Sequence, residues 1–268
     1  MSIASEITRL QNAKADLKTA IVAKGVEISD TDTIDTYASK VEAIESGGGK
    51  IVVDNCSYFC YHGVRADLVP KLYTSNCEYF TYMYKYDYDT EVVPELDTSN
   101  AIEIEGMFDN TQIVIIPKLN TSRVEHMNYV CRDSKKLTTV GGFDMLNAYN
   151  VSSLFKNCAE LTTLNLFNIR NSIQVGSGTS WGHKLTLDSL IGLIYELTDV
   201  GSSRTLTVGT ANMEKLANVY VKLIDITDDM RTADPYIDSK YPFVVCESTD
   251  EGAIPITDYV TSKRWSLA

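Results

Sequence analysis

The chain has 268 residues, of which 44% are hydrophobic and 22% charged, and this composition excludes collagen-like, low-complexity and wholly disordered proteins. Its 24 Lys and Arg are outnumbered by 36 Asp and Glu, which gives a formal net charge of −12. Because that charge repels phosphate backbones and anionic lipid headgroups, we expect no nucleic-acid partner and no membrane insertion.

The first predicted element is an amphipathic helix that ends near Gly25. Its stripe, at alternating spacings of four and three residues, contains Ile3, Ile7, Leu10, Lys14, Leu17 and Ile21. A second helical pattern covers about residues 33–44, and three glycines at 47–49 follow as a flexible joint. The two helices either pack within the chain, on each other or on the first repeat, or associate with a second copy through the apolar stripe.

Residues 5–44 resemble the opening of many phage and prophage tail-associated proteins. The shared run reads Glu6-Ile7-x-Arg9-Leu10, then Ala13-Lys14, Leu17 and Ala20-Ile21, before a tyrosine-containing helix. In those proteins this end is the attachment end. We therefore assign residues 1–46 as a helical attachment segment and residues 47–53 as the joint and a first strand. The first residues lack the basic start and apolar run of a secretion signal, so any export is expected to use another route.

A short motif then recurs at spacings of 24 and 23 residues, in residues 70–76, 94–100 and 117–123. The register extends to two degenerate copies, so that five copies cover about residues 54–171 of a repeat region bounded at 54–182. A repeat this short cannot enclose its own apolar side chains, so neighbouring copies must stack and share one core. The predicted fold class is therefore an α/β repeat solenoid.

The register predicts columns of apolar side chains in this shared core. Two columns contain Val69, Val93, Ile116, Val140 and Leu164, and Leu72, Leu96, Leu119, Phe143 and Phe167. Two more contain Phe59, Met83, Met107, Val130 and Leu154, and Cys60, Tyr84, Phe108, Cys131 and Phe155. Residues 113–116 suit a short strand, and residues 98–100 suit a turn or the start of a short helix.

These copies resemble leucine-rich repeats of the BspA-like bacterial surface-antigen class. Residues 151–164 follow the pattern of that class almost position by position, and residues 94–100 match it too. The departures are Cys60 and Cys131 in place of Phe, and residues 86–89 where a Cys-x-x-Leu step belongs. The resemblance implies a leucine-rich-repeat solenoid of about five repeats.

After Gly182 the period stops, and residues 183–268 are predicted to form an α/β cap that covers the end of the core. Within it we expect a helix at 186–198, a strand at 204–208 and a helix at 212–226. Residues 227–254 are expected to be an irregular insertion. Residues 258–268 resemble the Lys-Gly-Trp-x-Leu ending of the same phage-associated repeat proteins.

No catalytic or metal-binding set of residues stands out in the sequence. Residues 178–182 match the G-x-S-x-G pattern of serine hydrolases but lack its strand-to-helix context, so a hydrolase using Ser180 is kept only as an alternative. The three histidines lie in no zinc-ligand pattern, and Asp87, Asp89 and Glu91 are expected in a solvated loop. The cysteines stand mostly in core columns. We therefore expect a protein that is not an enzyme and has no cofactor and no metal.

Tyrosine is the exceptional residue, with 16 in the chain and eight of them in the first two copies. One column holds Tyr58, Tyr82 and Tyr129 together with Gly106 and Ser153, so we expect it to be partly exposed. Exposed rings with hydroxyl tips suit protein and glycan contacts. The candidate binding residues are Tyr58, Tyr82, Tyr86, Tyr88 and Tyr129; the alternative is that these rings only cover the N-terminal end of the core.

Together these features predict a non-enzymatic recognition module, held by its N-terminal helices to a phage or prophage tail. Its repeat surface is expected to contact a protein or glycan on a host cell. The expected location is the virion, or the bacterial cytoplasm before assembly. An alternative is a leucine-rich-repeat adhesin of the bacterial cell surface.

Overall fold

The computed structural model describes residues 3–22, 51–53, 55–63, 72–176, 184–240 and 242–268. Helix α1 covers Ile3–Val22, so the N-terminal helix is present. In its stripe Ile21 is buried, whereas Ile7 and Leu17 are exposed. The predicted end near Gly25, the helix at 33–44 and the glycine joint lie outside the described residues.

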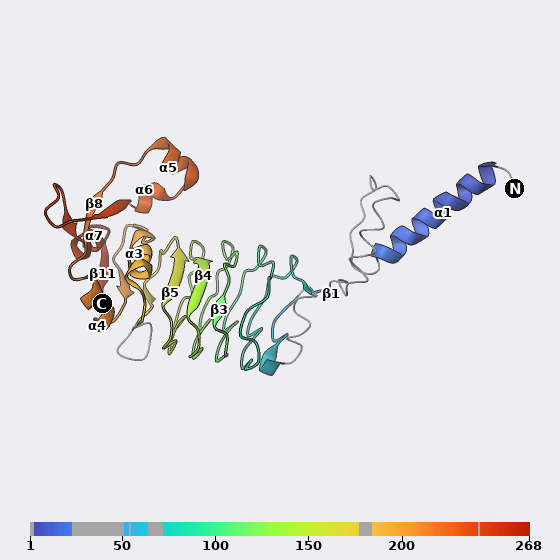
Figure 1. Cartoon of the computed structure of the whole chain (residues 1–268), viewed down its shortest axis with the longest axis horizontal. Helices are drawn as coiled ribbons and strands as arrows, with labels where there is room; N and C mark the ends of the chain where they lie inside the picture. The colour runs from blue at the N-terminus through green and yellow to red at the C-terminus, as the bar shows by residue number, and fades with distance from the viewer. Residues whose placement is uncertain (1–2, 23–50, 54, 64–71, 177–183, 241) are drawn as a thin grey trace.

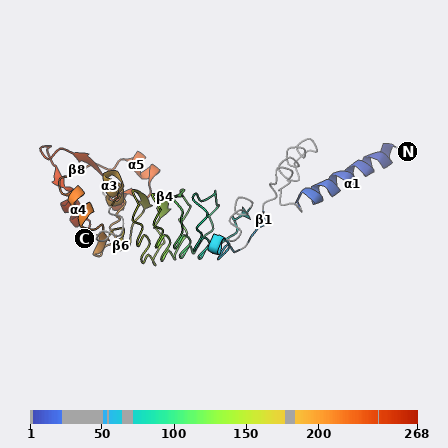
Figure 2. The same ribbon diagram turned by 60° about the horizontal axis from the view of Figure 1, so that its bottom comes forward.

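The middle of the chain is a stack of similar segments, which we call coils (Figure 1). Parallel bridges link the first residues of successive coils, Tyr79 to Glu103, Glu103 to His126 and His126 to Asn150. The first coil is described over residues 55–63 and 72–78, and coils two to five are residues 79–102, 103–125, 126–149 and 150–172. Figure 2 shows the same coils side by side from a second direction.

Short parallel strands form a second ladder on the stack. Strands β1 (Ile51–Val52) and β2 (Leu72–Tyr73) pair with each other, and β3 (Ile115–Ile116) pairs with β4 (Thr139–Asp144), which pairs with β5 (Thr163–Phe167). Ile116 stands opposite Val140, and Val140 stands opposite Leu164. The expected strand at 113–116 is thus shorter than predicted, and residues 98–100 form a turn without a helix.

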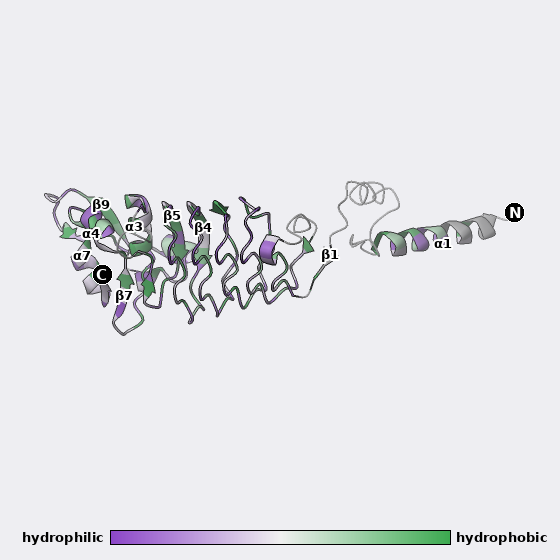
Figure 3. Cartoon of the chain, turned by 90° about the horizontal axis from the view of Figure 1, so that it is seen from below, coloured by the Kyte–Doolittle hydropathy of each residue, from purple (hydrophilic) through white to green (hydrophobic). Residues whose placement is uncertain are grey.

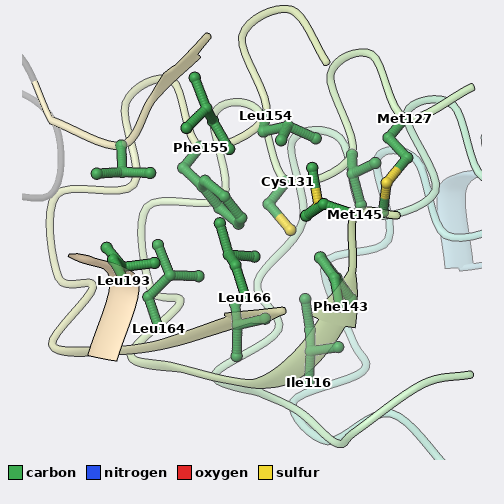
Figure 4. Packing of buried hydrophobic residues seen from close by; sticks show 14 of the residues in the cluster. Ile116, Met127, Cys131, Phe143, Met145, Leu154, Phe155, Leu164, Leu166 and Leu193 are labelled. Carbon is green, nitrogen blue, oxygen red and sulfur yellow. The ribbon is translucent and has the colours of Figure 1, made fainter. Parts of the chain in front are cut away.

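The predicted columns are buried inside the stack, which confirms the register. Val93, Ile116, Val140 and Leu164 are each at most 3% exposed, and Met83, Met107, Val130 and Leu154 are fully buried. Figure 4 shows Ile116, Phe143 and Leu164 facing Cys131, Leu154 and Phe155 across the core. Phe59 is half-buried, and Val69 lies outside the described residues. One predicted member of a column is wrong: a register shift between Val140 and Phe143 places buried Leu166 opposite Phe143, and half-buried Phe167 opposite Asp144. Figure 3 shows green and purple residues alternating along the coils, as a shared core requires.

Within the first coil, Tyr61–Gly63 form a 3-10 helix.

Further strands and helices follow the fifth coil and cover its end. Strand β6 (Ile173–Gln174) comes first, and helix α3 (Leu187–Tyr195) contacts β5. The Thr186 side chain caps α3 by accepting from the Ser189 N–H. Strand β7 (Arg204–Thr207) lies between β6 and β11 (Trp265–Leu267), and the Trp265 indole donates to the Thr198 carbonyl.

The expected helix at 212–226 is present only in part. Helix α4 covers Thr210–Leu216, and the chain then forms strand β8 (Tyr220–Leu223). Strand β8 pairs antiparallel with β9 (Phe243–Cys246) and β10 (Ile254–Pro255). The apolar spacing fits a helix, but β-branched residues and two available partner strands favour extended backbone here.

Residues 227–254, expected to be irregular, hold regular elements. They include α5 (Asp228–Ala233), α6 (Ile237–Lys240) and β9. Figure 1 shows α5, α6 and β8 projecting to one side at the C-terminal end of the stack. Helix α7 (Ile256–Ser262) then leads to β11, so residues 183–268 combine helices and strands as an α/β cap would.

A buried lysine lies where α7 meets α6. Lys263 is 1% exposed and donates to the carbonyl of Lys240, which also accepts from the Tyr259 hydroxyl. Burial lowers the pKa of Lys263 to about 7. This ammonium group is therefore held in a site that favours its neutral form.

We expect adjacent isoleucines on β3 to respond differently to truncation. Ile116→Ala removes a fully buried side chain and should lower the free energy of unfolding by about 2 to 5 kcal/mol. Ile115→Ala is the control, since Ile115 points outward and is 42% exposed; its effect should stay below about 1 kcal/mol. Urea unfolding of both variants measures the difference, and equal losses would contradict the shared core.

Lys263 should make stability depend on pH. An unfolded lysine keeps its proton to about pH 10, whereas folded Lys263 loses it near 7, so the unfolded state binds more protons and stability rises with pH between these values. Lys263→Met should reduce the slope of unfolding free energy between about pH 7.5 and 9 by about 1 kcal/mol per pH unit. Lys222→Met, at an exposed lysine of β8, should leave the slope unchanged. A slope unaltered by Lys263→Met would show that the ammonium is solvated.

Candidate functional site

The segment that opens each coil is held by two sets of backbone hydrogen bonds. In the second coil, Tyr82, Tyr84 and Tyr86 donate their N–H groups to carbonyls of the third coil at 2.8, 2.8 and 3.1 Å. The intervening residues Met83 and Lys85 donate to carbonyls of their own segment, at Phe80 and Tyr82. Alternate residues therefore tie the coil to its neighbour and close turns within it, which leaves the backbone little freedom.

Two positions in each of these segments have a left-handed backbone. The fourth residue of the coils has φ of 54–59° and is Tyr58, Tyr82, Gly106, Tyr129 or Ser153. The eighth residue has φ of 57–63° and is His62, Tyr86, Asn110, Asp133 or Asn157. Glycine, asparagine and aspartate adopt this conformation readily, and tyrosine rarely does. The column that mixes tyrosine with glycine and serine is thus defined by backbone geometry as well as by exposure.

Aromatic rings of the first two coils gather on these left-handed positions. We define the tyrosine surface as Tyr58, Tyr61, His62, Tyr82, Lys85 and Tyr86. The Tyr58 ring lies 5.6 Å from Tyr61 and 5.5 Å from Tyr82, and Tyr86 lies 5.6 Å from Tyr61. The His62 ring stacks on Tyr86 at 5.1 Å. These rings form one continuous patch, in which Tyr58 and His62 are exposed and Tyr82 and Tyr86 half-buried.

The structure brings together three of the five predicted tyrosines. Tyr58, Tyr82 and Tyr86 belong to the patch. Tyr129 lies beyond the third coil, where Gly106 has no ring, and Tyr88 is exposed without a ring contact among the described residues. Tyr84, assigned to the core by its column, is fully buried.

Sequence reasoning missed Tyr61, His62 and Lys85 as members of the patch. The signal that could have found His62 was its spacing of 24 residues from Tyr86, one repeat, which places the two rings side by side in successive coils. The Lys85 ammonium lies 4.3 Å from the centre of the Tyr82 ring and 5.1 Å from that of Tyr86. It therefore adds a cation to the surface that the rings form.

A buried carboxylate anchors the cations at the edge of the tyrosine surface. Asp109, only 1% exposed, forms an ion pair with Lys85 at 3.2 Å and accepts hydrogen bonds from both Nε and Nη2 of Arg132 at 2.9 and 2.6 Å. Its hydrogen bond raises the pKa of Arg132. The Arg132 guanidinium lies 4.5 Å from the centre of the Tyr129 ring. Asp109 thus links the second, third and fourth coils through fixed side chains.

Tyr82 has the most constrained ring of the patch. Its hydroxyl donates to Glu105 Oε1 at 3.0 Å, and a Cβ built on Gly106 would stand 2.1 Å from the ring. Burial and the hydrogen bond to Glu105 raise the pKa of Tyr82 to about 12. The hydroxyl is therefore protonated at neutral pH, and the ring packs against Gly106 of the third coil.

The other sequence-predicted sites have different outcomes. Ser180 and His183 lie outside the described residues. Asp87, expected in a solvated loop, is buried: its Oδ1 accepts the N–H groups of Asp89 and Thr90 at 3.0 Å and closes a turn. Among the described residues, no group of three or more His, Cys, Asp and Glu is placed to hold a metal ion.

The cysteines are free thiols in the described structure. Five of them are buried, and Cys246 is half-buried. The Sγ atoms of Cys56 and Cys77 lie 2.9 Å apart in the core of the first coil.

None of the helices in the described ranges has the length and apolar character needed to cross a bilayer.

Comparison with known protein families gives a match to part of the chain. Residues 71–180 match a leucine-rich-repeat-like family described as Mycoplasma protein of unknown function, DUF285. The matched residues contain the second, third, fourth and fifth coils and the strands between them. Searches of curated proteins and of solved structures found no match.

We expect only glycine to fit at position 106, because the Tyr82 ring packs against it. Gly106→Ala introduces a Cβ at φ of 56° and against the Tyr82 ring, so it should lower unfolding free energy by more than the about 1 kcal/mol of left-handed backbone strain. In a Tyr82→Ser background the contact disappears and the cost of Gly106→Ala should fall towards that strain alone.

Gly252→Ala is the matched control for Gly106→Ala, because Gly252 also has positive φ but its added Cβ would meet nothing closer than 3.8 Å. Chemical unfolding of the single and double variants completes the comparison. Additive effects of Tyr82→Ser and Gly106→Ala would contradict the packing of the ring on this glycine.

Proposed function

We propose that the coils are a leucine-rich-repeat solenoid of the BspA-like type, and that the chain is a non-enzymatic recognition module. Its tyrosine surface would contact a protein or glycan on a host cell. The observation that carries this proposal is the continuous patch of rings held on left-handed backbone. The family match over residues 71–180 and the step of 23 or 24 residues between paired strands support the repeat class.

The rings are suited to binding because they are fixed before a partner arrives. The backbone N–H groups of Tyr82 and Tyr86 donate to carbonyls of the next coil. Between them, Lys85 is fixed by its ion pair with Asp109. A rigid aromatic side chain loses little conformational entropy on contact, and its hydroxyl supplies a hydrogen bond at the rim. Tyr58, Tyr82 and Tyr86 have a backbone conformation that is unfavourable for tyrosine, and backbone strain of this kind clusters at binding sites.

Attachment to a phage or prophage tail is the part of the proposal that rests on resemblance. The opening run of residues 5–44 and the ending at 258–268 resemble those of tail-associated repeat proteins. Helix α1 supports it physically, since Ile7 and Leu17 leave apolar surface exposed on one stripe. In this arrangement the N-terminal helix attaches the chain and the coils present the tyrosine surface.

Loss of the rings should weaken binding without unfolding the chain. The triple variant Tyr58→Ser, Tyr82→Ser and Tyr86→Asn uses residues that other coils place at the same left-handed positions, at Ser153 and Asn110. The labelled full chain is tested against a glycan array and against isolated bacterial cell envelopes. We expect the triple variant to bind at least about tenfold more weakly than the native chain.

Tyr236→Ser provides the control for this experiment, because it removes an exposed tyrosine of the C-terminal region. It should leave binding unchanged, and circular dichroism should show equal folding of all variants. The proposal fails if neither array nor envelopes bind the native chain, or if the triple variant binds as well as the native chain.

A further inference from the structure

A second surface, apart from the tyrosine surface, lies where the strands end. Two depressions of about 620 and 710 Å³ share Lys118 and Asn120 and so form one groove. At one end the groove is lined by Tyr73 of β2, and at the other by Asp234 and Lys240 of the C-terminal insertion. We infer that this groove binds an unbranched, uncharged oligosaccharide, with successive sugar units along successive coils. The inference does not rest on the function proposed for the tyrosine surface.

A column of polar side chains follows the groove from coil to coil. It contains Asp97, Asn120, Asp144 and Asn168, which are 23, 24 and 24 residues apart. Neighbouring parallel strands lie about 4.8 Å apart, and polar groups that end or follow such strands recur at about that interval. Asp144 ends β4 opposite Phe167, and the next residue, Asn168, donates to it. The interval between strands is comparable with the length of one pyranose unit in an extended glycan. Hydroxyl groups of successive sugars can therefore meet successive side chains.

The polar column is held in place before any ligand binds. Oδ1 of Asn120 accepts the N–H of Ser122 at 3.3 Å, and Oδ1 of Asp144 accepts the N–H of Leu146 at 2.9 Å. The Asn168 amide also donates to Asp144 Oδ1 at 2.9 Å. Fixed side chains lose little entropy on binding, which favours recognition of a hydroxyl-rich ligand.

Two polar atoms in the wall of the groove lack a partner among the described residues. They are Oδ1 of Asn168 and Oγ1 of Thr98, on side chains at least nine-tenths buried. Thr121, at the position equivalent to Thr98 in the next coil, bonds both the N–H and the carbonyl of Asp144, and Thr74 does the same with Asp97. A buried polar atom without a partner is costly. Each of the two atoms exposes less than 1 Å², so a ligand hydroxyl, which is both donor and acceptor, reaches it only when a neighbouring side chain moves.

Aromatic rings stand at both ends of the polar column. Phe167 is half-buried and packs on Gly142, where an added Cβ would stand 2.7 Å from the ring. The Lys118 ammonium lies 5.2 Å from the centre of the same ring. At the other end Tyr73 is 45% exposed. Flat rings beside carboxylate and amide groups match the two faces of a pyranose, one apolar and one hydroxylated.

Charge and backbone pairing select this ligand class over others. Glu95, Asp97, Asp144, Glu196 and Asp234 line the groove with two lysines, and Lys240 is already paired with Glu196 and Asp234 at 2.6 Å each. The acidic excess disfavours anionic glycans. The backbone of Asp97 and Asp144 is bonded to Thr74 and Thr121, so a peptide cannot add to it as a strand.

The test is calorimetric titration of the full chain with linear β-1,4-linked hexasaccharides of glucose, N-acetylglucosamine, mannose and xylose, and with the four monosaccharides. We expect at least one hexasaccharide to bind at least about tenfold more tightly than its monosaccharide. The double variant Lys118→Ala and Asn120→Ala, which changes two exposed side chains shared by both depressions, should weaken that binding at least about tenfold. Lys156→Ala, at an exposed lysine outside the groove lining, should not alter it.

Other outcomes overturn the inference, and they separate it from the function proposed above. Absence of hexasaccharide binding, or equal binding by the Lys118 and Asn120 double variant, excludes the groove as a glycan site. Groove-dependent binding of an unstructured decapeptide in place of the glycans would assign it to peptides. If the triple tyrosine variant loses glycan binding and the groove variant keeps it, the glycan site is the tyrosine surface.

Discussion

The structure depends on one constraint, which is that each coil must close in 23 or 24 residues with its backbone donors facing the acceptors of the next coil. The parallel pairs Ile116–Val140 and Val140–Leu164 meet this condition in the strand ladder. The opening segments meet it through the bridges from Tyr79 to Asn150 and through alternate N–H groups that cross to the next coil. Because both segments are tied laterally, apolar side chains of successive coils must lie above one another and share one core.

The same constraint explains both candidate surfaces. Closing the opening segment requires left-handed residues at fixed places, and these places carry Tyr58, Tyr82 and Tyr86 in the first two coils. The ring of Tyr82 needs the small Gly106 beside it. At the strand ends, the repeated spacing aligns Asp97, Asn120 and their counterparts into the polar column of the groove. One backbone geometry therefore presents an aromatic surface at one place and a hydroxyl-binding surface at another.

The C-terminal region does more than cover the last coil. Glu196 follows α3, and Asp234 and Lys240 come from the insertion; together they form the end of the groove. Lys263 and Tyr259 hold the carbonyl of Lys240 from α7. The insertion is thus joined to the stack by ionic and polar contacts whose residues lie far apart in the sequence.

The sequence alone determined the period, most members of the core columns, the short helix after Thr186 and the crowding of tyrosines in the first two coils, because equivalent core positions in a stack demand similar side chains. It did not reveal the left-handed backbone, since Tyr58, Gly106 and Ser153 look unrelated until φ is known. Only the tertiary structure decided that residues 220–223 form a strand, that His62 and Lys85 join the tyrosines, and that a groove exists. Each of these depends on contacts between distant segments, which local propensity and periodicity do not encode.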